Sequence, residues 1–140
     1  MLIVDTSGLF AAIDRAAAEH EAARSVLQTE RGPILLSPFV LGELDYMLRT
    51  RIGPRAELDY LREVADGVYD LMPMTRHEVM EAADLIGRYA DMEIGLADAS
   101  IAVLGARHRT TRVLTLDQRH FRAMKPLWGD CFTVLPADLN

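Results

Sequence analysis

The chain has 140 residues, half of them hydrophobic, which is enough for one globular domain with its own core. Its 15 basic and 21 acidic residues give a formal net charge of −6, a balance that does not by itself favour a nucleic-acid partner. One cysteine, Cys131, excludes an internal disulfide, and because we find neither a signal peptide nor an apolar run long enough for a bilayer, we expect a cytoplasmic protein without membrane association.

Short apolar runs alternate along the chain with longer helical patterns. The expected strands are, in chain order, Leu2–Val4, Ile34–Leu36, Val68–Met72, Val113–Leu116 and Phe132–Leu135. The expected helices are one beginning with Leu9–Ile13, then Ala16–Gln28, Phe39–Arg49, Arg55–Ala65, Thr75 to about Tyr89, Leu96–His108 and Asp117–Met124. This alternation predicts an α/β fold, a three-layer α/β/α sandwich with a four- or five-stranded, mainly parallel sheet, in a single domain over residues 1–140.

Two acidic residues directly follow expected strands. Asp5 comes after Leu2–Val4, and Asp117 comes after Val113–Leu116. The carboxyl ends of parallel strands share one edge of the sheet, where ligands and catalytic groups collect. The alternative is that each aspartate only caps the helix that follows it.

Two further acids lie in helices that we expect to pack on the sheet. Glu43 shares a helical row with Phe39 and Met47, so it faces inward or lies at the edge of the core. Asp98 is the only charged side chain between residues 94 and 106. A structural salt bridge could account for Glu43, and a helix cap could account for Asp98.

If these four acids met, their charges would need to be neutralised. Two like charges about 4 Å apart repel by roughly 4 kcal/mol at an effective dielectric constant near 20. Several such pairs would rival the stability of a whole domain, about 5–15 kcal/mol. Protons or a bound cation would therefore be required, and an all-oxygen cluster suits Mg²⁺ or Mn²⁺.

A basic segment lies between Gly105 and Lys125, where the only acid is Asp117. Its arginines are Arg107, Arg109, Arg112, Arg119 and Arg122. Such a segment can bind a polyanion even in an acidic protein, although on charge alone a solvated surface is the simpler interpretation.

The chain resembles the PIN-domain ribonucleases and, within them, the VapC-type toxins of type II toxin–antitoxin (VapBC) pairs. The matching motifs are Ile3-Val4-Asp5-Thr6-Ser7, Ser37-Pro38 leading to Glu43, Leu96-Ala97-Asp98-Ala99, and Val113-Leu114-Thr115-Leu116-Asp117 followed by His120-Phe121. The motifs occur in the family's order over almost the whole chain. The resemblance implies a PIN-like fold in which Asp5, Glu43, Asp98 and Asp117 are a catalytic, metal-binding quartet, with Thr6 and Thr115 as supporting hydroxyls.

The same resemblance implies an Mg²⁺-dependent endoribonuclease, with Mn²⁺ as a substitute, that inhibits translation by cutting tRNA or rRNA. Hydrolysis would leave a 5′-phosphate and a 3′-hydroxyl, and the five arginines would hold the RNA backbone. The implied partners are the RNA substrate, a cognate VapB-type antitoxin and a second copy of the chain in a homodimer.

Two other interpretations remain open from the sequence. A receiver-like signalling domain also gathers acids around Mg²⁺. It needs an acidic doublet, which is absent here, and an aspartate directly after its middle strand, whereas Asp70 lies inside the expected strand Val68–Met72. The second alternative is a catalytically silent α/β binding module. The four histidines, among them His120, have no metal-ligand spacing, so we expect them on the surface or facing a partner.

Overall fold

A computed structural model describes residues 1–139 and contains one sheet of five parallel strands. The strands are β1 (Leu2–Val4), β2 (Ile34–Leu36), β3 (Asp70–Leu71), β4 (Arg112–Leu114) and β5 (Thr133–Leu135). Their order in the sheet is β3-β2-β1-β4-β5. The parallel α/β sandwich is thereby confirmed, and this order differs from the 2-1-3-4-5 order of receiver domains.

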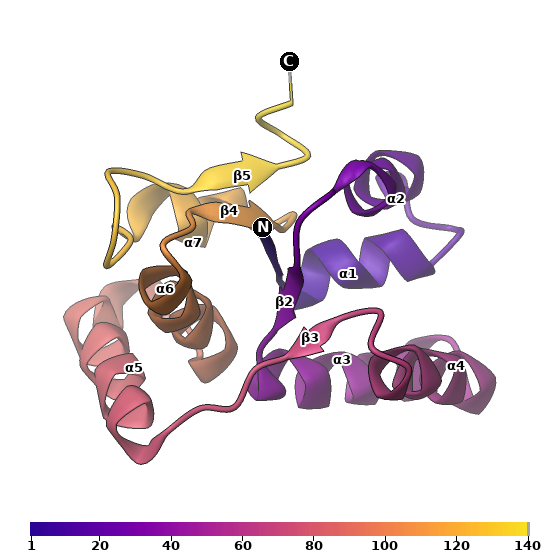
Figure 1. The fold of residues 1–140 in the computed structure, drawn as a ribbon, viewed down its shortest axis with the longest axis horizontal. Helices are drawn as coiled ribbons and strands as arrows, with labels where there is room; N and C mark the ends of the chain where they lie inside the picture. The colour runs from indigo at the N-terminus through magenta and orange to yellow at the C-terminus, as the bar shows by residue number, and fades with distance from the viewer. Residues whose placement is uncertain (140) are drawn as a thin grey trace.

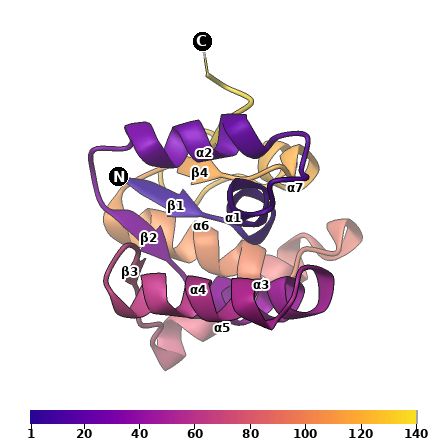
Figure 2. The same ribbon diagram turned by 90° about the vertical axis from the view of Figure 1, so that its right-hand side faces the viewer.

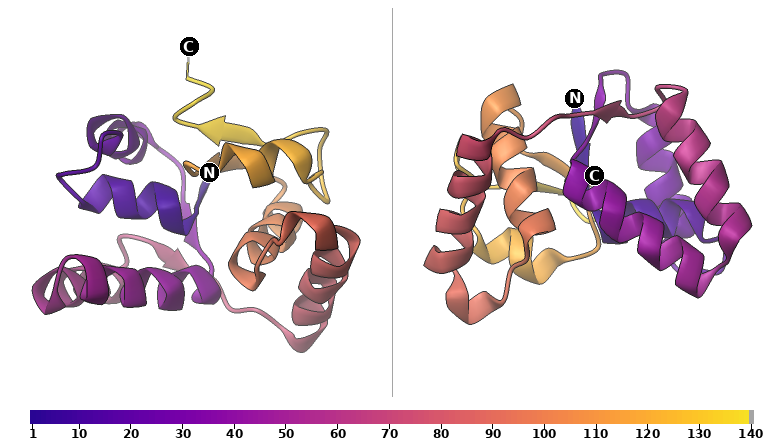
Figure 3. Two further views of the ribbon diagram at one scale, coloured as in Figure 1. Left: turned by 180° about the vertical axis from the view of Figure 1, so that it is seen from behind. Right: turned by 90° about the horizontal axis from the view of Figure 1, so that it is seen from below.

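Helices cover both faces of the sheet. They are α1 (Thr6–Ile13), α2 (His20–Thr29), α3 (Pro38–Arg51), α4 (Pro54–Ala65), α5 (Arg76–Arg88), α6 (Leu96–His108) and α7 (Gln118–Ala123), with a short 3₁₀ helix η1 (Ala90–Met92). Helices α5 and α6 lie on one side of the strands, and α1 and α2 lie on the other (Figure 1). Seen from below, the pairs α3–α4 and α5–α6 lie side by side, and α3 contacts α6 (Figure 3).

The first helix begins earlier than the sequence pattern indicates. It starts at Thr6 rather than near Leu9, so Asp5 is the last extended residue before it. Gly8 makes this possible, because a Cβ atom at that position would lie 2.4 Å from the carbonyl oxygen of Leu114. The first turn of α1 is therefore packed directly on the backbone of β4, as only glycine allows.

The third strand is shorter than expected. Only Asp70 and Leu71 pair with β2, although Met72 still donates its N–H to the Leu36 carbonyl at 2.9 Å. Both strand residues are exposed, because β3 is an edge strand and has no neighbour on its outer side.

Helix α6 is the buried centre of the molecule, as its nearly all-apolar sequence predicts. All residues from Ala99 to Gly105 are buried, and the helix packs on β1 and against α3 and α5. Because Asp98 lies in its first turn, α6 places this carboxylate at the carboxyl edge of the sheet. Among residues 1–139, no helix combines the length and the apolar character needed to cross a membrane.

A charged cluster closes the opposite, amino-terminal edge of the sheet. The buried carboxylate of Glu30 accepts hydrogen bonds from Arg112, from the amino group of Met1 and from the Gly32 N–H. Burial acts to raise the pKa of Glu30, but these hydrogen bonds outweigh it and lower the pKa to about 2. Arg112 is therefore engaged in holding this edge together.

Candidate functional site

All four predicted acids line one cavity at the carboxyl edge of the sheet. The cavity has a volume of about 310 Å³, and its walls are Asp5, Thr6, Ser7, Glu43, Met47, Gly95, Ala97, Asp98 and Asp117. Segments that are far apart in sequence thus converge here, as the shared edge of parallel strands predicts. The roles of the four acids remain predictions.

Asp5 is held by side-chain hydroxyls. Its Oδ2 accepts hydrogen bonds from Thr115 Oγ1 at 2.6 Å and from Ser7 Oγ at 3.3 Å. Its side chain makes no capping hydrogen bond to α1, so the cap interpretation of Asp5 is wrong. Ser7 was absent from the predicted site residues, although its position directly after the Asp5-Thr6 motif was a usable signal.

The pocket is poor in positive charge. The pKa of Asp5 is raised to about 7, chiefly by burial and also by the nearby carboxylates of Asp98 and Glu43, against the opposing hydrogen bond from Thr115. The pKa of Asp98 is also raised, again chiefly by burial. A cation would relieve this repulsion, whereas without one Asp5 retains a proton near neutral pH.

Asp98 and Asp117 share a histidine. His120 Nδ1 lies 3.1 Å from Asp98 Oδ2 and 2.8 Å from Asp117 Oδ2, while its Nε2 lies 2.9 Å from the Met92 carbonyl oxygen. Only 18% of the His120 side chain is exposed, so the prediction of a surface or partner-facing histidine is wrong. The spacing of three residues from Asp117, one helical turn, could have signalled this contact.

Capping and site formation coexist at these two aspartates. Asp117 Oδ1 accepts the backbone N–H of His120 at 3.0 Å and caps α7. Asp98 Oδ2 accepts the backbone N–H of Gly95 at 3.3 Å from within the first turn of α6. The cap interpretation is therefore correct for Asp117, whereas Asp98 is the third residue of α6, whose N-cap is Gly95, and does not cap a helix that begins after it. Both residues also line the cavity.

Glu43 lies at the mouth of the cavity. Its side chain is exposed. Of the two positions expected from the sequence, the one at the edge of the core is therefore confirmed, and the inward-facing one is wrong. The alternative of a structural salt bridge is wrong, because Glu43 forms no ion pair with any of residues 1–139.

The residues of the cavity fit a hydrated divalent cation. The Thr6 hydroxyl oxygen is buried and has no hydrogen-bond partner in the part of the chain that the structure describes, although the residue lines the cavity. Such an unpaired polar atom requires a water or an ion beside it. In addition, one ligand atom from each of Asp98, Asp117 and His120 lies within 4.8 Å of the others. A set dominated by carboxylate oxygens suits Mg²⁺ or Mn²⁺.

The five predicted RNA-binding arginines are not gathered at this cavity. Arg107 binds Glu78 at 3.0 Å, at the opposite end of α6 from Asp98, which is about 13 Å away by helical rise. Arg112 belongs to the Glu30 cluster, and Arg109 ends α6 with a positive φ. Only Arg119 and Arg122 lie on α7, next to Asp117.

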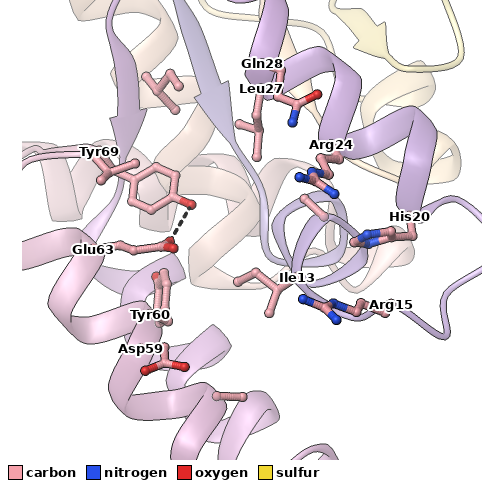
Figure 4. A pocket seen from close by; sticks show the side chains of 14 residues that line it. Ile13, Arg15, His20, Arg24, Leu27, Gln28, Asp59, Tyr60, Glu63 and Tyr69 are labelled. Atoms are coloured by element: carbon pink, nitrogen blue, oxygen red, sulfur yellow. Dashed lines mark hydrogen bonds between the residues drawn. The ribbon is translucent and has the colours of Figure 1, made fainter.

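A second and larger cavity, of about 560 Å³, lies between α2 and α4. Both helices lie to the right of β2 in Figure 1, and α2 is seen above α4 in Figure 2. Its walls carry opposite charges (Figure 4). Arg15, His20 and Arg24 form one wall, and Asp59 and Glu63 form the other. The apolar side chains at its base are Ala12, Ile13, Leu27 and Ile34.

No protein-family model matches the chain. It is 43% identical over 135 residues to "Ribonuclease VapC26" of Mycobacterium tuberculosis, covering 96% of this chain and 100% of that protein. Among solved structures, it resembles VapC20 of M. tuberculosis, a "Sarcin-Ricin loop cleaving toxin", with a TM-score of 0.81 and 22% identity over 88% of this chain and 95% of that one. It also resembles VapBC2 from Rickettsia felis, solved with a promoter DNA fragment, with a TM-score of 0.68 and 16% identity over 95% and 97% of the two chains.

The raised pKa of Asp5 predicts how pH affects the stability of the metal-free protein. Between pH 4 and 7 the unfolded chain loses this proton while the folded chain keeps it, so the free energy of unfolding falls as pH rises. A shift from 3.8 to about 7 corresponds to roughly 4 kcal/mol. Asp5→Asn should make this decline shallower and leave the smaller part that the raised pKa of Asp98 causes, as measured by denaturant unfolding in EDTA across the range. The exposed Asp84→Asn is the control, and parallel profiles for Asp5→Asn and wild type would contradict the assignment.

Proposed function

This chain belongs to the VapC family, the ribonuclease toxins of VapBC toxin–antitoxin pairs, and from that membership we propose that it hydrolyses RNA at the acidic cavity with the help of a divalent cation. The observation that carries the proposal is the convergence of Asp5, Glu43, Asp98 and Asp117 on one cavity beside the unpaired hydroxyl of Thr6. We take the cation to be Mg²⁺, with Mn²⁺ as a substitute.

Each residue has a distinct part in this proposal. The four carboxylates hold the cation, which when bound activates a water and offsets charge on the phosphate. The hydroxyls of Thr115 and Ser7 fix the orientation of the Asp5 carboxylate, and Thr6 contributes a further oxygen. His120 holds Asp98 and Asp117 at one spacing.

We take the substrate to be a single-stranded loop of tRNA or rRNA in the cytoplasm. Bases in a loop are unpaired and can be splayed to bring one phosphodiester to a concave site, unlike bases stacked in a helix. Cleavage of such a loop would inhibit translation. Arg119 and Arg122 are the arginines that we retain for contact with the backbone, because they lie on α7, whose N-cap Asp117 lines the acidic cavity. Arg122 is paired with Asp138, so it would exchange this partner for a phosphate.

We assign the oppositely charged groove to the VapB-type antitoxin. An apolar base flanked by one basic and one acidic wall fits an amphipathic helix whose two edges carry acidic and basic side chains respectively. Arg15 and Arg24 form no ion pair with residues 1–139, so both are available to such a helix. A homodimer is also part of the proposal, supported by the exposed apolar side chains of Tyr46 on α3 and Met80 on α5.

Asp98→Asn should abolish cleavage of RNA while the protein stays folded, because the cavity loses one of its charged ligands. Cleavage by the wild type should require Mg²⁺ or Mn²⁺ and stop in EDTA, as followed on labelled RNA by gel electrophoresis. Asp84→Asn, an exposed acid on α5, should cleave normally. Metal-independent cleavage, or full activity of Asp98→Asn, would contradict the proposed site, and absence of cleavage in the wild type would favour the silent binding module.

Arg119→Ala should weaken RNA binding and reduce the slope of log K against log salt concentration by about one unit, as expected for one lost phosphate contact. Arg112→Ala should instead lower thermal stability through the Glu30 cluster and leave that slope unchanged. Filter binding at several salt concentrations and thermal melts distinguish the two variants. If both arginines changed the slope equally, the basic surface would extend to the amino edge of the sheet.

Arg24→Glu should weaken antitoxin binding by about tenfold or more, since it places a like charge against the acidic edge of the bound helix. RNA cleavage by the free toxin should be unchanged. The control is Arg88→Glu, an exposed arginine on α5, on the other side of the molecule (Figure 1). Unchanged antitoxin affinity of Arg24→Glu, measured by calorimetry, would remove the groove from the interface.

A further inference from the structure

Two buried serines connect the helix that carries Glu43 to the helix that carries Asp98. Ser37 follows β2 and is the N-cap of α3, and Ser100 lies in the second turn of α6. Both side chains are 0% exposed, and their hydroxyl oxygens lie 2.7 Å apart. They form a direct polar link between two helices from distant parts of the sequence.

The direction of each hydrogen bond in this link follows from counting protons. Ser100 Oγ donates its single proton to the Ala97 carbonyl at 2.6 Å, so the proton between the two serines must come from Ser37. Ser37 Oγ in turn accepts the backbone N–H of Phe39 at 3.2 Å. The result is one continuous chain from the first turn of α3 to a backbone carbonyl in the first turn of α6, in which every group is satisfied.

This chain ends beside the acidic cavity. Ala97, whose carbonyl is the last acceptor, lines the cavity and directly precedes Asp98. Glu43 and Met47 line the cavity from α3, the helix that Ser37 caps. Apolar packing between α3 and α6 is not directional, so it tolerates small sliding movements, whereas hydrogen bonds of fixed geometry do not.

We propose that Ser37 and Ser100 are positioning residues, which fix α3 against α6 and thereby set the spacing of Glu43 and Asp98 that a divalent cation needs. The inference rests on the proposed function, because it takes the cavity to be the cation site. It adds two residues that touch neither the cation nor the RNA. Replacing both partners of a buried hydrogen bond with apolar groups of similar shape can be nearly neutral for stability. Ser37 also accepts the Phe39 N–H, so its substitution removes the N-cap of α3 as well, whereas Ser100→Ala leaves this cap in place and separates the effect on the cation from the loss of the cap.

The test is calorimetric titration of the full chain with Mn²⁺ alone, for wild type, Ser37→Ala, Ser100→Ala and the double variant. Each single substitution breaks the same link, so we expect affinity to fall by about tenfold in each, as is usual for residues that orient metal ligands. The double variant should be no weaker than the singles. The two single variants interrupt the link from different helices, so either one is sufficient if the other does not fold.

Thr110→Val is the matched control. Thr110 is also buried, and its hydroxyl accepts the Arg112 N–H at 3.3 Å and donates to the Met1 carbonyl at 3.5 Å, at the opposite edge of the sheet. It should lower the melting temperature without changing Mn²⁺ affinity. If the serines had a purely structural role, Ser100→Ala would also lower the melting temperature without changing Mn²⁺ affinity. That result would overturn the inference.

Asp98→Asn, titrated in parallel, separates this inference from the proposed function. If Asp98→Asn loses Mn²⁺ binding while both serine variants keep wild-type affinity, the serine link has no positioning role and the cation site stands. If Asp98→Asn binds Mn²⁺ as the wild type does, the cavity is not the cation site and both proposals fall.

Discussion

The repulsion between carboxylates that share one small cavity is the constraint around which this molecule is arranged. Asp5 is almost fully buried and lies beside two other acids, which is unfavourable unless a proton or a cation is present. The fold meets this need in three ways: hydroxyls of Thr115 and Ser7 contact Asp5, the backbone N–H of Gly95 contacts Asp98, and His120 contacts Asp98 and Asp117. A site of this kind reduces the stability of the fold locally, because its carboxylates repel one another.

The sequence was sufficient to predict the parallel sheet and the convergence of the four acids on one edge of it. Strand runs such as Leu2–Val4 and the buried pattern of 96–108 are governed by local composition and periodicity, and the structure reproduces both ranges. The placement of Asp5 and Asp117 follows from a rule of topology, since strands that are all parallel end at one edge. Ser37 and Pro38 have the residue types typical of a helix start, and they are the N-cap and the first residue of α3.

Contacts between distant segments could not be predicted from the sequence, because the relative orientation of these segments is set by packing. The bond between Ser37 and Ser100 spans 63 residues, and no local pattern marks it. The expectation that the arginines of the basic segment lie together was wrong for a related reason. Helix α6 ends and strand β4 begins at the amino-terminal edge of the sheet, and β4 then runs to the carboxyl edge, so Arg107 and Arg112 lie at one edge and the arginines of α7 at the other. Arg107 and Arg112 are thereby engaged by Glu78 and Glu30 far from the acids.

The close approach of Gly8 to the Leu114 carbonyl has a consequence for genetics. Cells that survive expression of a toxin carry alleles without toxin activity. Such alleles fall into two classes, those that change the site and those that disrupt the contact between α1 and β4. Under the proposed function, substitutions of the carboxylates would remove cleavage and leave the fold intact. A side chain at Gly8 would instead force α1 away from β4, so such an allele would lose the toxin by losing the fold.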